Sequence, residues 1–198
     1  MQQKQTKLTE ADFEGAAASL RCEVASIEAV CTIEAPRGFF EPTGEPVILF
    51  ERHKFSLHTG GRFDQSHPLI SNPKRGGYGR YKDQHKRLAE AVELDRDAAL
   101  KSASWGGFQI LGENYRQAGF PTLQRFINAM YQDAPAHLDA FVAFILADPR
   151  LPRAIRARDW YTFAEIYNGA GQDSPPGRVD DYDYRIGQAY LRIKARRG

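Results

Sequence analysis

The 198-residue sequence lacks the features that mark several classes of protein. No stretch approaches the run of about 18 apolar residues that a membrane-spanning helix needs. Residues 1–7 are polar and no apolar segment follows them, so we expect no signal peptide and synthesis in the cytoplasm. The sequence contains neither an internal repeat nor a low-complexity tract. These absences leave an ordinary globular chain.

Cysteine is also scarce, with Cys22 and Cys31 as the only two. Their separation of nine positions along one helix corresponds to about 13 Å, whereas a disulfide requires Cα atoms within about 7 Å. We therefore expect two free thiols. The five histidines show neither the spacing of a metal site nor a nucleophile beside them, and we expect neither a metal nor an organic cofactor.

Charge of one sign is not in large excess, because the formal net charge is only +2, and we do not expect nucleic-acid binding. Cations do gather at the end of the chain, where residues 192–198 hold four and no acid. At a solvated helix end, cations suit the negative end of the helix dipole. Contact with an anionic surface is the alternative. The four cations are Arg192, Lys194, Arg196 and Arg197.

Hydrophobic residues, at 42%, are abundant enough for a buried core, and their spacing predicts mostly helices. Thr9 and Asp12 form a variant of the capping box that opens a helix through Leu20. Residues 37–82 are rich in glycine and include the apolar run 47–50, which predicts an irregular lobe with short strands. Further helices are expected over 23–34, 83–93, 95–102, 122–131, 135–147, 159–167 and 180–196.

These elements predict an α+β fold that is mostly α-helical. We expect a single domain with two lobes, the smaller of which contains the strands. The domain is expected to span residues 8–198, after a tail of residues 1–7, and to end in the basic helix. A cleft between the lobes is the expected place for a ligand.

The helix predicted over 23–34 carries a carboxylate in an unusual place. Val24, Ile27, Cys31 and Glu34 fall on one face of this helix. Because that face is apolar, we expect it to point inward, with Glu34 at its C-terminal end. Burial and the negative end of the helix dipole both raise the pKa of a carboxyl group. The alternative is that Glu34, as an end residue, turns out to solvent.

A carboxylic acid that keeps its proton near neutral pH is the group that cleavage of a glycosidic bond requires. Several later segments suit a sugar ligand, because glycine lets the backbone approach a flat ring and a glutamine amide both donates and accepts hydrogen bonds. Aromatic rings can stack on sugars, although Trp105, Phe108 and Tyr115 have the alternative of packing in a core. The segments are Phe50-Glu51-Arg52-His53, Ser104-Trp105-Gly106-Gly107-Phe108-Gln109-Ile110, Gly112-Glu113-Asn114-Tyr115 and Tyr167-Asn168-Gly169.

In this order, the segments resemble the N-acetylmuramidase family of phage endolysins and, more distantly, goose-type lysozymes and lytic transglycosylases. The resemblance runs over residues 8–191 and implies a lysozyme-like fold with Glu34 as the catalytic glutamate. It also implies that Ser104, Gly106 and Gln109 line the floor of a cleft and that Tyr167 and Asn168 lie beside the scissile bond. Tyr115 is included because its ring could stack on a sugar. The expected substrate-binding residues are Ser104, Gly106, Gln109, Tyr115, Tyr167 and Asn168.

Glu51 is a candidate for a second catalytic carboxylate, and three roles remain open for it. It could be a base that activates water, a partner that raises the pKa of Glu34, or a structural acid paired with Arg52. Retaining hydrolysis requires the two carboxyl groups about 5 Å apart, and inverting hydrolysis requires roughly 6.5–9.5 Å.

The resemblance implies hydrolysis of the β-1,4 bond between N-acetylmuramic acid and N-acetylglucosamine in bacterial peptidoglycan, at the host cell wall. A lytic transglycosylase that uses the same glutamate and a non-catalytic peptidoglycan-binding protein are the alternatives. Residues 180–198 could also form a cationic helix that contacts anionic outer-membrane lipopolysaccharide. The apolar side of this cationic helix would comprise Ile186, Ala189, Tyr190 and Ile193.

We expect the protein to be a monomer.

Overall fold

The computed structural model describes residues 4–167 and 181–198, and helices dominate them. The α-helices are α1 (Glu10–Leu20), α2 (Val24–Glu34), α3 (Arg52–Thr59), α4 (Gln84–Leu94), α5 (Arg96–Lys101), α6 (Leu123–Gln132), α7 (Ala134–Ala147), α8 (Arg150–Ala157), α9 (Trp160–Tyr167) and α10 (Tyr182–Arg197). The strands are β1 (Ile48–Phe50), β2 (Ala103–Trp105) and β3 (Ile110–Leu111), and two short 3-10 helices are η1 (Tyr81–Asp83) and η2 (Gly112–Asn114).

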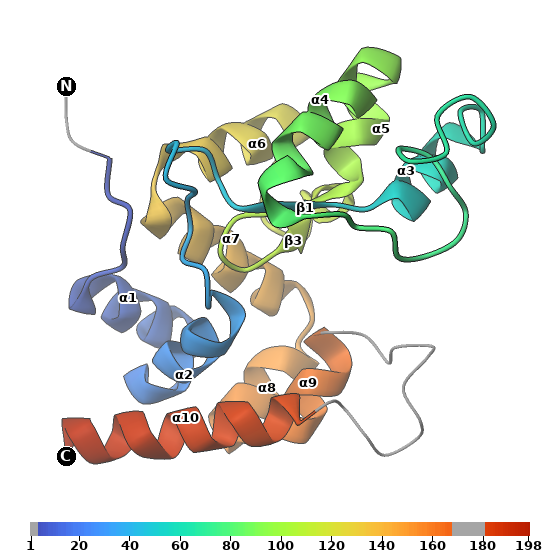
Figure 1. The fold of residues 1–198 in the computed structure, drawn as a ribbon. Helices are drawn as coiled ribbons and strands as arrows, with labels where there is room; N and C mark the ends of the chain where they lie inside the picture. The colour runs from blue at the N-terminus through green and yellow to red at the C-terminus, as the bar shows by residue number, and fades with distance from the viewer. Residues whose placement is uncertain (1–3, 168–180) are drawn as a thin grey trace.

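The helices and strands form two lobes (Figure 1). The lower lobe in this view consists of α1, α2, α8, α9 and α10, and α10 packs against α2. The upper lobe holds the antiparallel sheet, in the order β1-β2-β3, together with α3, α4 and α5. In the sheet, Leu49 pairs with Ser104, and Ser104 pairs with Leu111 on the other side. The predicted fold, mostly helical with strands in the smaller lobe, is confirmed.

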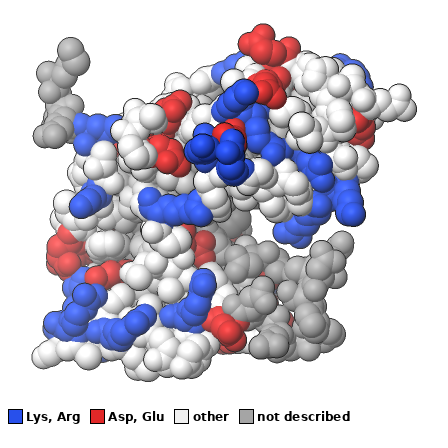
Figure 2. Space-filling model, in the orientation of Figure 1, with Lys and Arg blue, Asp and Glu red and all other residues white. Residues whose placement is uncertain are grey.

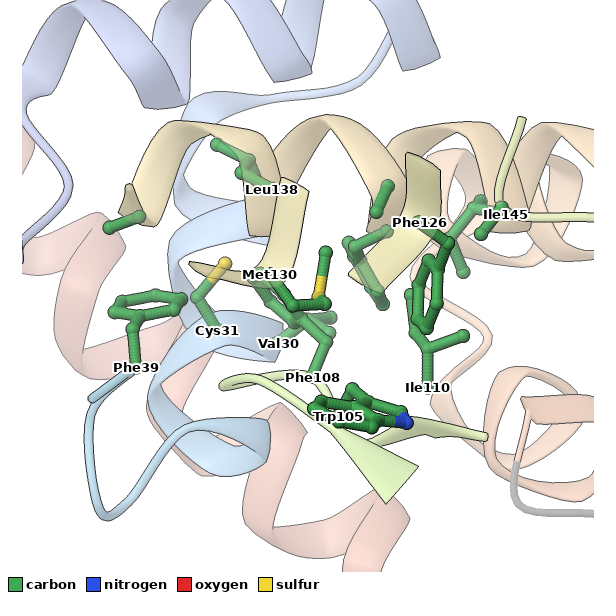
Figure 3. Close-up of a cluster of buried hydrophobic side chains, with 14 of the residues drawn as sticks. Val30, Cys31, Phe39, Trp105, Phe108, Ile110, Phe126, Met130, Leu138 and Ile145 are labelled. Carbon is green, nitrogen blue, oxygen red and sulfur yellow. The ribbon is translucent and has the colours of Figure 1, made fainter. Parts of the chain in front are cut away.

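A continuous cluster of buried side chains joins the lobes (Figure 3). Val30 of α2, Trp105 of β2, Met130 of α6 and Leu138 of α7 all belong to it. Each large apolar side chain that is fully buried contributes roughly 1.5–3 kcal/mol to folding. The two lobes are therefore held in place by shared packing, which fixes the residues that lie between them.

Most of the predicted helices begin and end within two residues of the observed bounds. The capping box at Thr9 and Asp12 is present, because Thr9 Oγ1 accepts from the Asp12 amide while the Asp12 carboxylate accepts from the Thr9 amide. Cys22 and Cys31 are both free thiols, as their spacing predicts.

Two helices and two strands differ from the prediction. Helix α8 was not predicted, because prolines usually mark a connection between helices; here Pro149 lies at the N-cap and Pro152 in the first turn, where a helix needs no amide hydrogen from proline. Helix α3 was also not predicted, because it buries only Phe55 and Ser56 and so has little apolar periodicity. β2 and β3, which lie between the helices predicted over 95–102 and 122–131, are too short to show a strand pattern.

The residues predicted as an N-terminal tail lie against the domain from Lys4 onward. The Gln5 carbonyl accepts a hydrogen bond from the Ala134 amide at 2.8 Å, and Lys4 Nζ lies 3.7 Å from the centre of the Phe40 ring. Within the described ranges, no helix combines the length and the apolar character needed to cross a lipid bilayer.

The basic end of α10 is bound to the lower lobe by ion pairs. Lys194 Nζ lies 2.6 Å from a Glu23 oxygen, and the Arg197 guanidinium reaches Glu10 at 2.6 Å and Glu28 at 2.8 Å. The side of α10 that was expected to be apolar packs inside the protein instead of facing a lipid surface. Its buried members are Ile186, Ala189, Tyr190 and Ile193.

Candidate active site

Glu34 is the last residue of α2, and its carboxyl group lies between the ends of three helices. Ile27 and Cys31, which precede it on the same face, are buried, as the helical spacing predicts. Glu34 itself is half-buried, and its Oε1 accepts a hydrogen bond from the Tyr182 hydroxyl at the start of α10. The side chain therefore points inward, and the alternative of a carboxylate turned out to solvent is wrong.

The surroundings of Glu34 act on its pKa in opposite directions. Burial disfavours the charged form and raises the pKa of Glu34 to about 7, although the Tyr182 hydroxyl and the positive charge of Arg185 oppose the rise. A carboxyl group with this pKa is protonated in about half of the molecules at neutral pH. It can therefore both give and take a proton under these conditions.

Two tyrosines stand beside this carboxyl group. Tyr182 is the first residue of α10, is 7% exposed, and follows Asp181, whose φ of 45° lies in the left-handed region. Tyr167 is the last residue of α9, and its hydroxyl donates to the Phe108 carbonyl at 3.0 Å. Burial and the negative charge of Glu34 hold the pKa of Tyr167 well above its ordinary value, which indicates that this ring lies close to the carboxyl group.

The segment from Ser104 to Ile110 forms β2, a tight turn and β3. Gly106 and Gln109 both have left-handed backbone conformations, with φ of 70° and 49°. The Gln109 amide donates to the Gly106 carbonyl at 2.8 Å, and Ser104 Oγ donates to Glu51 Oε1 at 3.3 Å. These side chains, predicted to bind substrate, thus make internal hydrogen bonds that shape the turn.

His137 of α7 anchors this turn from behind. Its Nδ1 accepts from the Gly107 amide at 3.2 Å, and its Nε2 donates to the Met130 carbonyl at 2.7 Å. A Cβ atom on Gly106 would lie 2.6 Å from His137 Nδ1, so only glycine fits there. Burial lowers the pKa of His137 to about 4, which keeps the ring neutral. The glycine is thus required by packing within the protein.

Glu51 lies at the N-cap of α3, directly after β1, and faces β2. Besides Ser104, its carboxylate lies 3.6 Å from His53 Nε2. The alternative in which Glu51 pairs with Arg52 is wrong, because the Arg52 guanidinium donates to the Gly76 carbonyl at 2.8 Å. Glu51 is also not among the groups that shift the pKa of Glu34. Of the three roles considered, that of a charged partner for Glu34 therefore lacks support.

Two predicted substrate-binding residues remain, Tyr115 and Asn168. Tyr115 packs partly buried against the core, with the Arg116 guanidinium 5.3 Å from its ring centre. Its neighbour Glu113 binds Lys54 and His58 of α3, both at 2.8 Å. Asn168 lies outside the described residues.

The sequence analysis missed Tyr182, Arg185 and His137. The apolar spacing of the last helix predicts a buried face that includes Tyr182, but nothing in the spacing identifies its partner, which lies 148 residues away. His137 could have been suspected, because it stands on the buried side of α7 beside Leu138 and Phe141.

The surface beside the lobes is hollowed at the right of Figure 2, and lysines and arginines line the upper edge of the hollow. A separate cavity of about 420 Å³ opens next to Ala35, between residues 6–8 and 37–40. Glu34 is not among the residues that line this cavity, so the cavity is not the site of the carboxyl chemistry.

Comparison with known proteins shows extensive similarity. The family model described as N-acetylmuramidase matches residues 23–194. The crystal structure of the Burkholderia AP3 phage endolysin superposes with a TM-score of 0.87 at 33% sequence identity, covering 100% of this chain and 74% of that chain. No curated protein matches the sequence.

Proposed function

Because the chain belongs to the N-acetylmuramidase family, a family of peptidoglycan hydrolases, we propose that it cleaves the β-1,4 bond between N-acetylmuramic acid and N-acetylglucosamine, with Glu34 as the general acid. The observation that carries this proposal is the half-buried carboxyl group of Glu34, whose pKa is raised to about 7. We assign residues 8–198 to one catalytic domain that needs neither a metal nor an organic cofactor.

The proposed reaction begins with proton transfer from Glu34 to the oxygen of the scissile bond. Positive charge then develops on the sugar carbon as the bond breaks. Burial favours the protonated acid before this step. The Tyr182 hydroxyl and the charge of Arg185 favour the carboxylate that remains after it. These opposing effects bring the pKa of Glu34 close to the working pH, where general acid catalysis is most efficient.

Tyr182 acts in this scheme as a positioning residue. Its hydroxyl occupies Oε1 of Glu34, so Oε2 remains for the proton that is transferred. Tyr167, the second tyrosine beside the carboxyl group, is itself held in place. Its ring stacks on Phe163 at 5.4 Å, and the Tyr167 hydroxyl donates to the Phe108 carbonyl. The Tyr182 hydrogen bond restricts the carboxyl group to one orientation, which general acid catalysis requires.

We assign Glu51 a structural role. Its carboxylate is engaged by Ser104 on β2 and lies close to His53 on α3, so it ties the sheet to the following helix.

A lytic transglycosylase is the second candidate. Within the part of the chain that is described, no second carboxylate contacts Glu34, and an internal attack by the sugar itself would need only one acid-base group. Mass spectrometry of digested muropeptides separates the two reactions, because the anhydro product is lighter than the hydrolysed product by one water. Exclusively anhydro products would replace the hydrolase assignment.

The test of the catalytic proposal is Glu34→Gln. Loss of general acid catalysis should lower lysis of purified cell walls by about 10²–10⁴-fold, while folding and wall binding survive. Glu28→Gln is the matched control, because Glu28 lies on the same helix and its contacts are to Arg196 and Arg197. Lysis that persists in Glu34→Gln would show that another group donates the proton. A wild-type protein that binds walls but releases no sugar would instead be a non-catalytic binder.

A further inference from the structure

A second pocket lies on the outer surface where α9 begins and beside the first turns of α10. These two helices lie next to each other at the lower right of Figure 1. The pocket has a volume of about 520 Å³ and combines aromatic with polar side chains. Its principal lining residues are Asp159, Trp160, Tyr161, Asp183, Tyr184 and Gln188. None of them is among the residues placed around Glu34, which are Tyr167, Tyr182 and Arg185.

The aromatic rings of this pocket are unusually accessible. Tyr184 is 65% exposed and Tyr161 is 43% exposed. Trp160 packs on Tyr190, with ring centres 5.8 Å apart, and its indole faces α10 at Gly187. A Cβ atom at Gly187 would lie 3.3 Å from Trp160 Cδ1, so a larger side chain would crowd the indole edge. Glycine inside a helix costs about 1 kcal/mol relative to alanine, and here it keeps room beside the ring.

Polar groups in the same pocket retain capacity for hydrogen bonds. The Trp160 Nε1–H, the Gln188 amide and the Asp183 carboxylate have no side-chain hydrogen-bond partner among the described residues. A carboxylate accepts, an indole donates, and an amide does both. Such groups around aromatic rings match a ligand with flat apolar faces and a rim of hydroxyl and amide groups.

We propose that this pocket is a saccharide-binding site that holds a neutral stretch of N-acetylated glycan. The volume falls within the range of about 300–1,000 Å³ typical of small-ligand sites. An anionic ligand fits poorly, because two carboxylates line the pocket and the guanidinium of Arg158 is engaged by Glu23 at 3.4 Å. A sugar presents apolar ring faces to the tyrosines and hydroxyl edges to Asp183 and Gln188.

The location suggests how the pocket would serve a polymer-cutting enzyme, and in this respect the inference rests on the proposed function. Trp160 and Tyr167 stand at opposite ends of α9, about 10 Å apart along the helix axis. Tyr184 follows Tyr182 by two positions on α10 but points away from Glu34, into the pocket. A glycan held here keeps the insoluble wall close to Glu34 and raises its effective concentration there.

Intrinsic fluorescence tests the site directly, because the chain has only two tryptophans and Trp105 is 1% exposed. The probe is the tetramer of N-acetylglucosamine, added to the full chain carrying Glu34→Gln so that nothing is cleaved. We expect a saturable change in emission that Trp160→Phe abolishes. Tyr184→Ala should weaken the apparent affinity at least fivefold. Tyr81→Ala is the matched control, since Tyr81 is 47% exposed and lies on η1, outside the pocket.

A second measurement separates this site from the catalytic site. In the otherwise wild-type chain, Tyr184→Ala should reduce binding to sedimented walls severalfold and leave turnover of a short soluble glycan unchanged. An emission change that Tyr184→Ala and Tyr81→Ala leave equally intact would overturn the saccharide site. Lysis that survives Glu34→Gln would overturn the catalytic proposal alone, because the fluorescence experiment does not depend on cleavage.

Discussion

Glu34 shows how one side chain acquires a chemical role from its surroundings. In water its carboxyl group would be ionised at neutral pH. Burial at the end of α2 makes the protonated form competitive, and Tyr182 and Arg185 keep the pKa from rising further. The opposing contributions come from α2 and α10, so the acid depends on how these two helices meet.

Removing the Tyr182 hydroxyl should alter the pH dependence of the reaction. In Tyr182→Phe, Glu34 loses the hydrogen bond that lowers its pKa, so the pKa rises. Activity requires the protonated acid and is lost as pH rises through this pKa. The alkaline limb of the kcat profile should therefore move to higher pH by about one unit, the equivalent of a charged hydrogen bond of about 1.5 kcal/mol.

Tyr190→Phe provides the comparison for this experiment. Tyr190 stands on the same helix, and its hydroxyl also donates to a glutamate of the lower lobe, Glu23, at 2.9 Å. This variant should lose some stability but keep the alkaline limb where it is. An equal shift in both variants would mean that Tyr182 acts only through the general stability of α10.

The sequence reveals one half of this site. The three- and four-residue spacing along α2 indicates that Glu34 ends an apolar face, because helical periodicity is a local property. The hydroxyl that meets it belongs to a residue 148 positions later, and the encounter depends on how α10 crosses α2. Local spacing carries no information on such a crossing.

At the scale of elements, the turn between β2 and β3 depends on α7. His137 must be neutral, because its Nδ1 accepts the Gly107 amide hydrogen while its Nε2 donates to the Met130 carbonyl. Protonation would place a hydrogen on Nδ1, which could then no longer accept the hydrogen bond from the Gly107 amide. The geometry of the segment between Ser104 and Ile110 is therefore linked to the charge of a buried ring.

This linkage predicts an acid-sensitive fold. The pKa of His137 is lowered to about 4, whereas an unfolded chain takes up this proton near pH 6.5. As the pH falls from about 6.5 to 4, the unfolded state binds more protons, so the free energy of unfolding should drop by up to roughly 3 kcal/mol. We expect urea denaturation of the wild type and His137→Gln to show that the wild type loses up to roughly 3 kcal/mol relative to the variant as the pH falls over this range.

Glu34 contributes with the opposite sign, which is why the comparison between the two proteins is needed. Its pKa is raised to about 7, so its contribution to stability is fully present below about pH 4.5 and is lost as pH rises to 7. Both proteins contain Glu34, and its effect cancels in the difference. Parallel pH profiles for the two proteins would rule out titration of His137 as a source of acid sensitivity.

The elements that the sequence predicts well are those with strong local patterns. Helix α6, for example, follows a Thr122 cap and repeats buried residues at Leu123, Phe126, Ile127 and Met130. β2 and β3 have three and two residues, so their pairing is determined by contacts with β1 and α7 rather than by alternation along the chain. Short strands of this kind require tertiary structure to be recognised.

At the scale of the whole molecule, α10 closes the lower lobe by joining the end of the chain to its beginning. Three of the four terminal cations contact glutamates of the lower lobe: Lys194 with Glu23, Arg196 with Glu28 at 3.7 Å, and Arg197 with Glu10 and Glu28. The sequence shows the cations but not these partners, because the pairs join residues more than 160 positions apart.

Truncation after Leu191 should therefore weaken the fold as a whole. It removes Ile193, which is 3% exposed, and cuts the ion pairs that hold the helix. Burial of this side chain alone contributes about 2 kcal/mol. We expect a lower melting temperature and weaker lysis of bare peptidoglycan. Weaker killing of intact bacteria by this variant would therefore not show that residues 192–198 contact lipopolysaccharide.

A test of the proposed contact with anionic lipopolysaccharide needs a variant that leaves Ile193 and the ion pairs of Lys194 and Arg197 in place. Arg192 and Arg196 line a groove of about 560 Å³ beside Thr32, and Arg196 is 71% exposed. The double variant Arg192→Gln, Arg196→Gln removes two charges at the cost of the exposed Arg196–Glu28 contact at 3.7 Å, and keeps Ile193 together with the shorter ion pairs of Lys194 and Arg197. We expect it to reduce killing of intact Gram-negative cells, most strongly at low salt, where attraction between exposed charges is least screened. Activity on bare peptidoglycan should remain at the wild-type level, and unchanged killing of intact cells would dismiss the contact.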